Sequence, residues 1–374
     1  MKVLLFANTD WYLYNFRRDL ALALRERGED VVLLSPPGEY AGRLQALGFR
    51  WLDFPLSRRG MNPLMELRTI GRLASLYRAE RPDLVHHFTI KCVLYGMLAA
   101  RFAGVRAVVN SITGLGYVFL PGGAWKRFLR FFVRLWYRML LRGTQVIFEN
   151  DDDRQAFLRS GLIRPEDGHT IPGVGVDTTR FTPTPLPAGK PIVLLAARML
   201  WDKGVGEFVE AARRLQTQGI QARFVLAGRI DPGNPSSISE EQIKAWHDEG
   251  TIEWWGWIED MPALLKEASI VCLPSYREGL PTVLIEASAC GRPVVASDVP
   301  GCRLTVQDGI TGLLVKERDA VSLSEAIRKL ILNPSVCQEM GTAGRHLVEE
   351  MFSSEQILHK IFAVYAEAGK RQVG

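Results

Sequence analysis

Cysteine is scarce in this sequence, and the few cysteines present are not grouped. Five cysteines are scattered over 374 residues, and no two of them form a C-x-x-C motif. An odd and widely spaced set argues against a disulfide framework or a cysteine zinc site. We therefore expect a protein of a reducing compartment, the cytoplasm.

Long apolar runs and a dinucleotide-binding loop are missing as well. The first apolar run covers only Val3 to Ala7, which is too short for the hydrophobic region of a signal peptide. No later run approaches the length of a membrane span, so we expect a soluble chain. No G-x-G-x-x-G motif follows a predicted strand, which argues against an NAD-dependent dehydrogenase.

Positive charge is concentrated in one segment, although the net charge is only +5. Residues 125–143 contain no acid, and the segment repeats arginines at helical spacing between aromatic residues. Such a helix can lie on an anionic membrane surface, or it can be a domain helix whose arginines face water. The segment is not part of a wider basic stripe, which argues against binding of nucleic acid. The membrane interpretation rests on Trp125, Lys126, Arg127, Phe128, Arg130, Phe131, Arg134 and Arg138.

Short apolar strands alternate with amphipathic helices along the whole chain. This pattern predicts an α/β protein with doubly wound parallel sheets. The proline-rich segment 182–191 interrupts the alternation, so we predict two domains, residues 1–183 and 184–352, with a helix at 353–374 that packs back on the first. The predicted strands are 2–7, 30–34, 84–86, 107–110 and 145–149, then 192–196, 223–226, 270–273 and 294–296.

Two glutamates, Glu278 and Glu286, flank a Gly-Leu-Pro turn in the stretch "SYREGLPTVLIEASACG". The turn follows a predicted strand, and Pro281 opens a predicted helix, whose N-terminus offers free N–H groups to a phosphate. The two acids are therefore candidates to bind sugar hydroxyls beside that phosphate. The alternative is that they only complement the helix dipole.

Two cations follow the first strand of the second half. Arg198 and Lys203 lie five residues apart in "AARMLWDKGV", at the same predicted sheet edge as the Pro281 turn. They can bind a diphosphate, Arg198 through its planar fork and Lys203 as a point charge. They can equally be two solvated cations beside Asp202.

These motifs together resemble the retaining glycosyltransferases of family 4, which have the GT-B fold of two facing Rossmann-like domains. "SYREGLPTVLIEASACGRPVVASDVPG" is similar to the E-x7-E signature of the family, and "AARMLWDKGV" to its Arg and Lys pair. "IPGVGVDTTRF" and "VQDGITGLLV" resemble the segments before and after them. The motifs occur in the order of the family.

The resemblance implies a role for each matching residue. Glu286 would hold the ribose of a nucleotide sugar, and Glu278 the donor sugar, while Arg198 and Lys203 would neutralise the leaving diphosphate. No metal and no further cofactor is implied. The donor-binding backbone would come from Gly279, Leu280, Pro281 and Thr282.

The first half departs from the family pattern. Thr113 precedes Gly114 where many members carry a His-Gly pair, and the usual glycine-rich first loop is replaced by "NTDWYLYNFRRDL". His86 or His87 is expected to face the acceptor side, although a single buried histidine is more often structural. Asp10 or Asp19 is a candidate for the base that takes the acceptor proton, and we favour Asp10 because it lies in the loop after the first strand, whereas Asp19 is predicted to lie on the following helix.

The departures resemble a branch of the family that extends sugars linked to polyprenyl diphosphate in bacterial glycan assembly. That branch implies a UDP-sugar donor, often an N-acetylhexosamine, and a lipid-linked saccharide acceptor at the inner face of the membrane. Its diphosphate would meet cations such as Arg17, Arg18, Arg58, Arg59 and Lys126.

Other interpretations remain open at this point. Asp151 and Asp153 in "NDDDRQ" mimic a metal-binding D-x-D motif, but they open a predicted helix and are better explained as capping acids. The chain could also be a sugar-nucleotide sensor without catalysis, a glycosyltransferase with a soluble acceptor, or a sugar-nucleotide epimerase, which the basic segment disfavours.

Overall fold

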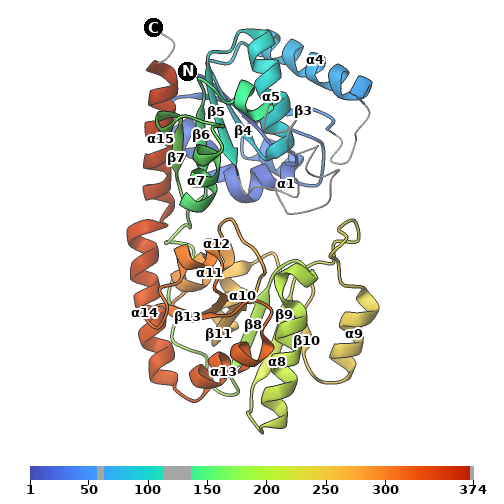
Figure 1. Ribbon diagram of the computed structural model, residues 1–374, viewed down its shortest axis with the longest axis vertical. Coiled ribbons are helices and arrows are strands. Elements are labelled where there is room, and N and C mark those ends of the chain that lie inside the picture. The colour runs from blue at the N-terminus through green and yellow to red at the C-terminus, as the bar shows by residue number, and fades with distance from the viewer. Residues whose placement is uncertain (57–62, 113–135, 371–374) are drawn as a thin grey trace. The chain divides into compact units, whose positions relative to one another are not determined.

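The computed structural model describes residues 1–56, 63–112 and 136–370, and these form two compact units (Figure 1). Unit 1 comprises Met1–Val174 and Ile357–Gly374, and unit 2 comprises Gly175–Gln356. Unit 2 thus begins before residue 184, where the sequence analysis drew the boundary. The reason is packing, because Val176 and Phe181 are buried in a hydrophobic cluster of unit 2.

Unit 1 is built on a seven-stranded sheet in the order β3-β2-β1-β4-β5-β6-β7, with every neighbouring pair parallel. Its central strands are buried on both faces, as expected for a parallel sheet covered by helices. The strands are β1 (Lys2–Phe6), β2 (Asp30–Ser35), β3 (Arg50–Asp53), β4 (Leu84–Phe88), β5 (Ala107–Ile112), β6 (Gln145–Phe148) and β7 (Gly168–Thr170).

Helices cover both faces of this sheet. One face packs on α4, α5 and α7, and the other packs on α2, α3 and the C-terminal helix α15. The chain therefore returns to unit 1 at its C-terminal end. The helices are α1 (Asp10–Tyr12), the π-helical turn η1 (Leu13–Arg17), α2 (Arg18–Glu26), α3 (Ala41–Ala46), α4 (Pro63–Glu80), α5 (Ile90–Ala103), α7 (Asp151–Arg159), the 3-10 turn η3 (Pro165–Asp167) and α15 (Ser354–Lys370).

Unit 2 repeats the plan with a six-stranded parallel sheet in the order β10-β9-β8-β11-β12-β13. Because all neighbouring strands are parallel, crossover connections link them. The strands are β8 (Ile192–Ala196), β9 (Arg223–Ala227), β10 (Glu253–Trp254), β11 (Ile270–Leu273), β12 (Val294–Ser297) and β13 (Gly312–Val315).

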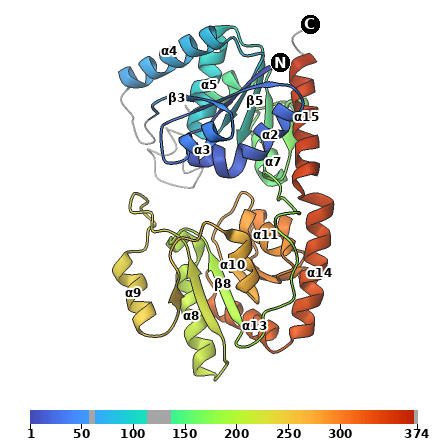
Figure 2. The same ribbon diagram turned by 180° about the vertical axis from the view of Figure 1, so that it is seen from behind.

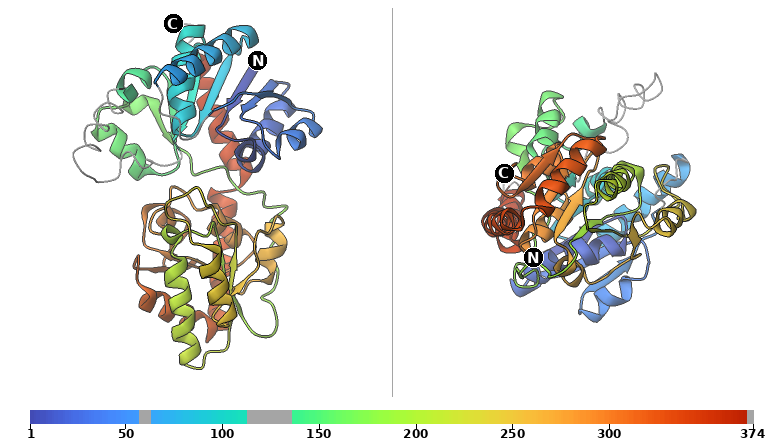
Figure 3. Two further views of the ribbon diagram at one scale, coloured as in Figure 1. Left: turned by 90° about the vertical axis from the view of Figure 1, so that its right-hand side faces the viewer. Right: turned by 90° about the horizontal axis from the view of Figure 1, so that it is seen from below.

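The helices of unit 2 lie on both faces of its sheet (Figures 2 and 3). One hydrophobic cluster includes residues of α10, α11 and α12, and the other includes residues of α8, α9 and α13, while α14 contributes to both. The helices are the 3-10 turn η4 (Trp201–Lys203), α8 (Val205–Thr217), α9 (Glu240–Asp248), α10 (Met261–Glu267), α11 (Thr282–Ala289), α12 (Pro300–Thr305), α13 (Ala320–Ile331) and α14 (Pro334–Met351).

The proline-rich segment 182–191 is anchored to unit 2. Arg292 is fully buried, and its guanidinium donates to the carbonyls of Leu265 and Pro185, both at 3.1 Å, and to the hydroxyl of Thr184. A buried guanidinium needs such acceptors, because its N–H groups have lost water. The segment is thus held to the rest of unit 2 by hydrogen bonds.

No helix in the described part of the chain combines the length and the apolar character needed to cross a bilayer.

Candidate active site

Two neighbouring strands of unit 2 mark the sheet edge where a ligand is expected. The strand order reverses between β8 and β11, which pair directly. The loop after β8 covers residues 197–204, and the loop after β11 covers residues 274–281. Open parallel sheets bind ligands at such a reversal, outside the carboxyl ends of the strands. The predicted donor residues Arg198, Lys203 and Glu278 belong to these two loops.

The structure brings Lys203 and Glu278 into direct contact. The Lys203 Nζ lies 2.5 Å from the Glu278 Oε1, and the side chains are 21% and 11% exposed. An ammonium carries three N–H donors, so the contact with Glu278 leaves two for another anion. The pair therefore holds the Lys203 ammonium in place at the carboxyl edge of the sheet.

Backbone contacts hold the two loops against each other. The Tyr276 N–H donates to the Asp202 carbonyl at 2.9 Å, and the Ser275 hydroxyl donates to the same carbonyl at 3.1 Å. Gly204 follows Lys203 with φ of 72°, and a Cβ there would lie 2.0 Å from the Pro274 carbonyl oxygen. Only glycine combines this conformation with this approach. The position of Lys203 is therefore set by the backbone.

The Gly-Leu-Pro turn leads into α11 as predicted. Pro281 is the N-cap residue and Thr282 the first helical residue, and no side chain caps the helix. Leu280 is buried in a hydrophobic cluster, which anchors the turn. A Cβ on Gly301 of α12 would lie 2.6 Å from the Glu278 carbonyl oxygen and 2.7 Å from that of Gly279. Close packing of the α12 backbone against this turn thus fixes its position.

Glu286 lies in the second turn of α11. Its side chain is half-buried, and within the described residues its carboxylate accepts no hydrogen bond. Burial raises the pKa of Glu286 to about 7, and the positive charge of Arg180 opposes this shift only in part. A carboxylate with free acceptor positions suits a ligand that brings its own hydroxyl donors.

Arg198 is placed differently from Lys203. Its guanidinium Nη1 lies 2.9 Å from the Oδ2 of Asp231, and both side chains are exposed to solvent. Asp231 follows β9, the strand on the other side of β8, and the sequence analysis did not identify it. The "DPG" turn after a predicted strand was the available signal.

A second contact missed by the sequence analysis links the β11 loop to α8. The Tyr276 hydroxyl donates to the Glu207 Oε1 at 2.7 Å, and the guanidinium of Arg318 lies 4.3 Å from the centre of the Tyr276 ring. Burial raises the pKa of Tyr276 to about 12, so this hydroxyl keeps its proton at neutral pH. The contact helps to hold the loop that carries Glu278.

Asp10, the predicted base, is held by backbone hydrogen bonds, and its role as a base stays a prediction. It is buried at the start of α1, and its Oδ2 accepts the backbone N–H groups of Tyr40 and Ala41 at 2.8 and 2.9 Å. Its Oδ1 accepts the N–H of Trp11 at 2.8 Å. These donors explain why a carboxylate is buried here, because they replace its water.

His86 is not on an acceptor surface, which corrects the prediction. It is fully buried in β4, its Nδ1 lies 2.7 Å from the Tyr365 hydroxyl, and its Nε2 lies 2.8 Å from the Ser111 hydroxyl. Burial, and then the charge of Arg17, lowers the pKa of His86 well below its usual value, so the ring is neutral. Burial also lowers the pKa of His87 to about 4, and both of its nitrogens contact side chains.

Arg17 is also buried, against the prediction of a surface position. Its Nη2 donates to the Tyr12 hydroxyl at 2.7 Å, and its guanidinium lies 4.3 Å from the centre of the Phe88 ring. Stacking on aromatic rings stabilises a cation in such a place. Arg18 is half-buried and pairs with the neighbouring Asp19 at 3.0 Å.

Most residues predicted to contact the membrane, three of the cations predicted to meet the lipid diphosphate, and the Thr113-Gly114 pair lie outside the described residues. Of the basic segment, Arg138 is described, and its side chain is exposed. The residues outside the description are Arg58, Arg59, Thr113, Gly114, Trp125, Lys126, Arg127, Phe128, Arg130, Phe131 and Arg134.

The acids of "NDDDRQ" open α7, as the capping interpretation expects. Asn150 is the N-cap, and its side chain accepts the N–H of Asp153 at 2.8 Å. Asp151 pairs with Arg154 at 3.2 Å within the first turn. Among residues 1–56, 63–112 and 136–370, no group of three His, Cys, Asp or Glu side chains is arranged to hold a metal ion.

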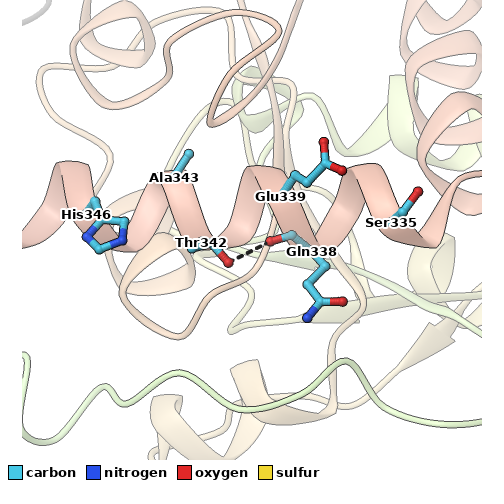
Figure 4. Close-up of a pocket in the computed structure, with 6 residues that line it drawn as sticks. All are labelled: Ser335, Gln338, Glu339, Thr342, Ala343 and His346. Carbon is cyan, nitrogen blue, oxygen red and sulfur yellow. Dashed lines mark hydrogen bonds between the residues drawn. The ribbon is translucent and has the colours of Figure 1, made fainter.

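A surface hollow of about 550 Å³ lies along α14 (Figure 4). One helix supplies its whole lining, and the Thr342 hydroxyl donates to the Gln338 carbonyl at 2.9 Å. It shares no residue with the β8 and β11 loops, so we assign it no function. Its lining is Ser335, Gln338, Glu339, Thr342, Ala343 and His346.

Comparisons with known proteins match both units. Residues 177–347 match the family described as glycosyl transferases group 1, and residues 15–173 match a glycosyl transferase 4-like domain. An N,N'-diacetylbacillosaminyl-diphospho-undecaprenol α-1,3-N-acetylgalactosaminyltransferase of Campylobacter jejuni is 32% identical over 333 residues, which covers 85% of this chain and 86% of that protein. A UDP-Gal:α-D-GlcNAc-diphosphoundecaprenol α-1,3-galactosyltransferase of Escherichia coli is 24% identical over 84% of this chain and 82% of that protein.

Solved structures share the fold over nearly the whole chain. A glycosyltransferase from Rickettsia africae superposes with a TM-score of 0.80 at 20% identity, and the match covers 98% of both chains. The sucrose-phosphate synthase of Thermosynechococcus elongatus gives 0.79 at 23% identity, again over 98% of both chains. With its family matches and its two parallel-sheet units, the chain belongs to the group 1 glycosyl transferases and is a glycosyltransferase of the GT-B fold.

Proposed function

We propose that this glycosyltransferase moves a sugar from a UDP-sugar to a saccharide carried on polyprenyl diphosphate. The proposed donor sugar is an N-acetylhexosamine, and the transfer retains its anomeric configuration. The relatives from Campylobacter jejuni and Escherichia coli are both named for diphospho-undecaprenol substrates, which supports this acceptor class. The proposed place of action is the inner face of the membrane, in the assembly of a surface polysaccharide or a glycoprotein glycan.

The observation that carries the donor half of the proposal is the Lys203 and Glu278 pair at the β8 and β11 edge. A nucleotide sugar leaves as a diphosphate, and negative charge grows on it as the glycosidic bond breaks. A cation already held in place stabilises that charge without having to reorganise. Glu278 holds the Lys203 ammonium there, and the α11 N-terminus adds backbone N–H groups on the same turn.

The other donor residues have distinct proposed roles. Glu286 accepts the ribose hydroxyls with the free positions of its carboxylate. Arg198 is exposed and can turn from Asp231 to the diphosphate, because both partners of a surface ion pair exchange readily with solvent. Positive charge from Arg198 and Lys203 takes the place that a divalent cation fills in other transferases, so no metal is proposed.

The proposal is tested by a transfer assay. Purified protein is incubated with bacterial lipid extract and one radiolabelled donor at a time, namely UDP-GlcNAc, UDP-GalNAc, UDP-glucose, UDP-galactose or GDP-mannose. We expect label in the organic phase with one UDP-N-acetylhexosamine. We expect Lys203→Met to lower kcat by about a hundredfold or more, since it removes charge that is needed in the transition state.

Lys244→Met is the matched control, because Lys244 also pairs with a glutamate but does so on the exposed face of α9. It should transfer sugar at the normal rate. Label that stays in the water phase on a soluble saccharide would refute the lipid acceptor. Binding of UDP without transfer to any acceptor would refute catalysis and favour a sensor.

A further inference from the structure

The first two turns of α4 expose apolar side chains to an unusual degree. Leu64, Met65 and Leu67 are 71%, 64% and 65% exposed, and no other large apolar side chain of the described residues is as exposed as these. The rest of the helix packs normally, since Leu73, Ala74 and Tyr77 are buried against the sheet. Clustered exposed apolar side chains mark an interaction surface, whereas single ones do not.

The same helix carries exposed arginines, and its glutamates form ion pairs with other elements. Arg68 and Arg72 are exposed one and two turns beyond Leu64, on the same side of the helix. Glu66 pairs with Lys91 of α5 at 2.9 Å, and Glu80 pairs with Arg50 at 2.7 Å. Both glutamates are largely buried. The exposed side of α4 therefore presents apolar groups and cations together, with its carboxylates already neutralised.

The N-terminal end of α4 lies close to the N-terminal end of α5 in unit 1. The Glu66 and Lys91 contact places the first turn of α4 beside the first turn of α5. Because α5 begins directly after β4, the exposed end of α4 lies at the carboxyl edge of this sheet (Figures 1 and 2). Ligand-binding loops of a parallel sheet gather at that edge. The apolar cluster is thus on the side of unit 1 where an acceptor is expected.

The C-terminal ends of α4 and α5 also combine arginines with exposed apolar side chains. The Arg78 Nη2 donates to the Phe102 carbonyl at 2.6 Å, and the Arg101 Nη2 donates to the Met139 carbonyl at 2.5 Å. The first bond joins the end of α4 to the end of α5. The second bond joins the end of α5 to the segment 136–142. Phe102 and Met139 are exposed there, and α5 and residues 136–142 contain no acid.

We infer that the α4 face, defined by Leu64, Met65, Leu67, Arg68 and Arg72, docks on an anionic lipid bilayer. The apolar side chains enter the boundary between headgroups and acyl chains, and the arginines contact lipid phosphates. A second copy of the chain fits this face poorly, because a two-fold contact would bring like charges together. The inference rests on the proposed lipid-linked acceptor. Docking of the α4 face would bring the carboxyl edge of the unit 1 sheet close to the membrane that carries this acceptor.

Vesicle flotation tests the inference directly. The full chain is mixed with vesicles of phosphatidylcholine alone, or of phosphatidylcholine with phosphatidylglycerol. We expect binding to the anionic vesicles that weakens with added salt. Reversal of two charges in Arg68→Glu/Arg72→Glu should weaken binding by about tenfold or more. The triple variant Leu64→Ser/Met65→Ser/Leu67→Ser should weaken it by a similar factor and should leave the melting temperature unchanged.

Controls separate this inference from the proposed function. Ile310→Ser/Leu332→Ser removes two exposed apolar side chains of unit 2 and should bind vesicles normally. With a short-tailed acceptor in solution, the α4 variants should transfer sugar as the unchanged protein does. Absence of transfer to any acceptor would refute the proposed function while leaving the vesicle result to stand.

Three results would overturn the inference. The first is an unchanged protein that does not float with anionic vesicles. The second is an α4 variant that floats as well as the unchanged protein. The third is a dimer in solution that the triple variant converts to a monomer, since this would assign the α4 face to a second copy of the chain.

Discussion

Among single residues, Glu286 has a carboxyl group whose charge state changes near neutral pH. Burial raises the pKa of its carboxyl group to about 7, against an ordinary value of 4.5. The proposed role of Glu286 requires a carboxylate that accepts two ribose hydroxyls. Below pH 7 the free protein holds a proton that this role excludes, so binding of a nucleotide must release that proton.

We therefore predict that the affinity for UDP rises as the pH increases from about 5.5 to 7 and levels off above that value. The limiting slope is about tenfold per pH unit while the group is protonated. Isothermal titration calorimetry at a series of pH values measures it. Glu286→Gln should bind UDP weakly and without this slope, and the same slope in Glu286→Gln would contradict the assignment.

The same shift predicts a pH effect on stability. The unfolded chain ionises Glu286 near pH 4.5, whereas the folded protein keeps the proton to about pH 7. The folded protein binds more protons in this window, so its free energy of unfolding falls as the pH rises from 4.5 to 7. Urea unfolding at these pH values should show a smaller fall for Glu286→Gln.

The residues of the site differ in how far the sequence could predict them. Glu278, Lys203 and the turn at Pro281 follow from a strand-to-helix pattern and a recognisable motif, and they lie where that pattern puts them. His86 misled the prediction, because β4 is buried on both faces and its sequence shows no alternation to mark the exposed side. Asp231 could not be paired with Arg198, since the contact depends on the order of strands in the sheet.

Among the elements, the turn between β8 and α8 carries Lys203 of the proposed donor site. It brings η4 against the end of β11, and Gly204 permits the approach. The first helical segment of unit 1 shows a comparable local feature, because the π-helical turn η1 precedes α2. Side-chain periodicity does not reveal such a turn.

We predict that Gly204→Ala displaces Lys203 and lowers both stability and UDP affinity. Gly219→Ala is the matched control, because Gly219 has φ of 75° and no atom within 4 Å of an added Cβ. The free energy of unfolding of the control should fall only by the cost of alanine in a left-handed backbone conformation, about 1 kcal/mol. The control should bind UDP normally. Urea unfolding and calorimetry measure the two effects. Equal losses in both variants would contradict the role given to the close contact.

The long central strands were easier to predict than the short outer ones. The sequence analysis placed β1, β2, β4, β5, β6, β8, β9, β11 and β12 within a few residues of their ends. It did not predict β3, β7, β10 or β13. β7 and β10 have only three and two residues, and β3 and β10 are only half-buried, so these three strands lack the continuous apolar run that marks a central strand. This reason does not apply to β13, which has four residues, as many as β12.

For the whole molecule, unit 1 is assembled from two separate parts of the chain. Helix α15 returns to cover one face of its sheet, with Ile357, Ile361 and Val364 buried in the same cluster as Val3 and Leu5. The contact of Tyr365 with His86 adds a polar link within this core. Unit 2, in contrast, is one continuous segment.

We predict that a fragment of residues 1–174 does not unfold cooperatively, because it exposes the apolar face that α15 covers. A fragment of residues 175–356 should unfold in one cooperative transition. Joining residues 354–374 to the first fragment through a flexible linker should restore its transition. Circular dichroism during thermal unfolding measures all three, and cooperative melting of 1–174 alone would refute the prediction.

The chain passes between the units twice, and the two passages lie side by side. Val176 forms a parallel bridge with Ser353, with hydrogen bonds of 2.8 Å to the Phe352 carbonyl and 3.0 Å from the Ser354 N–H. A Cβ on Gly175 would lie 2.7 Å from the Ser354 Cα. Unit 2 lies in the sequence between the two parts of unit 1, and its two ends meet. Recombination can therefore exchange the whole segment through two adjacent junctions, so that a new unit 2 can be joined to an unchanged unit 1.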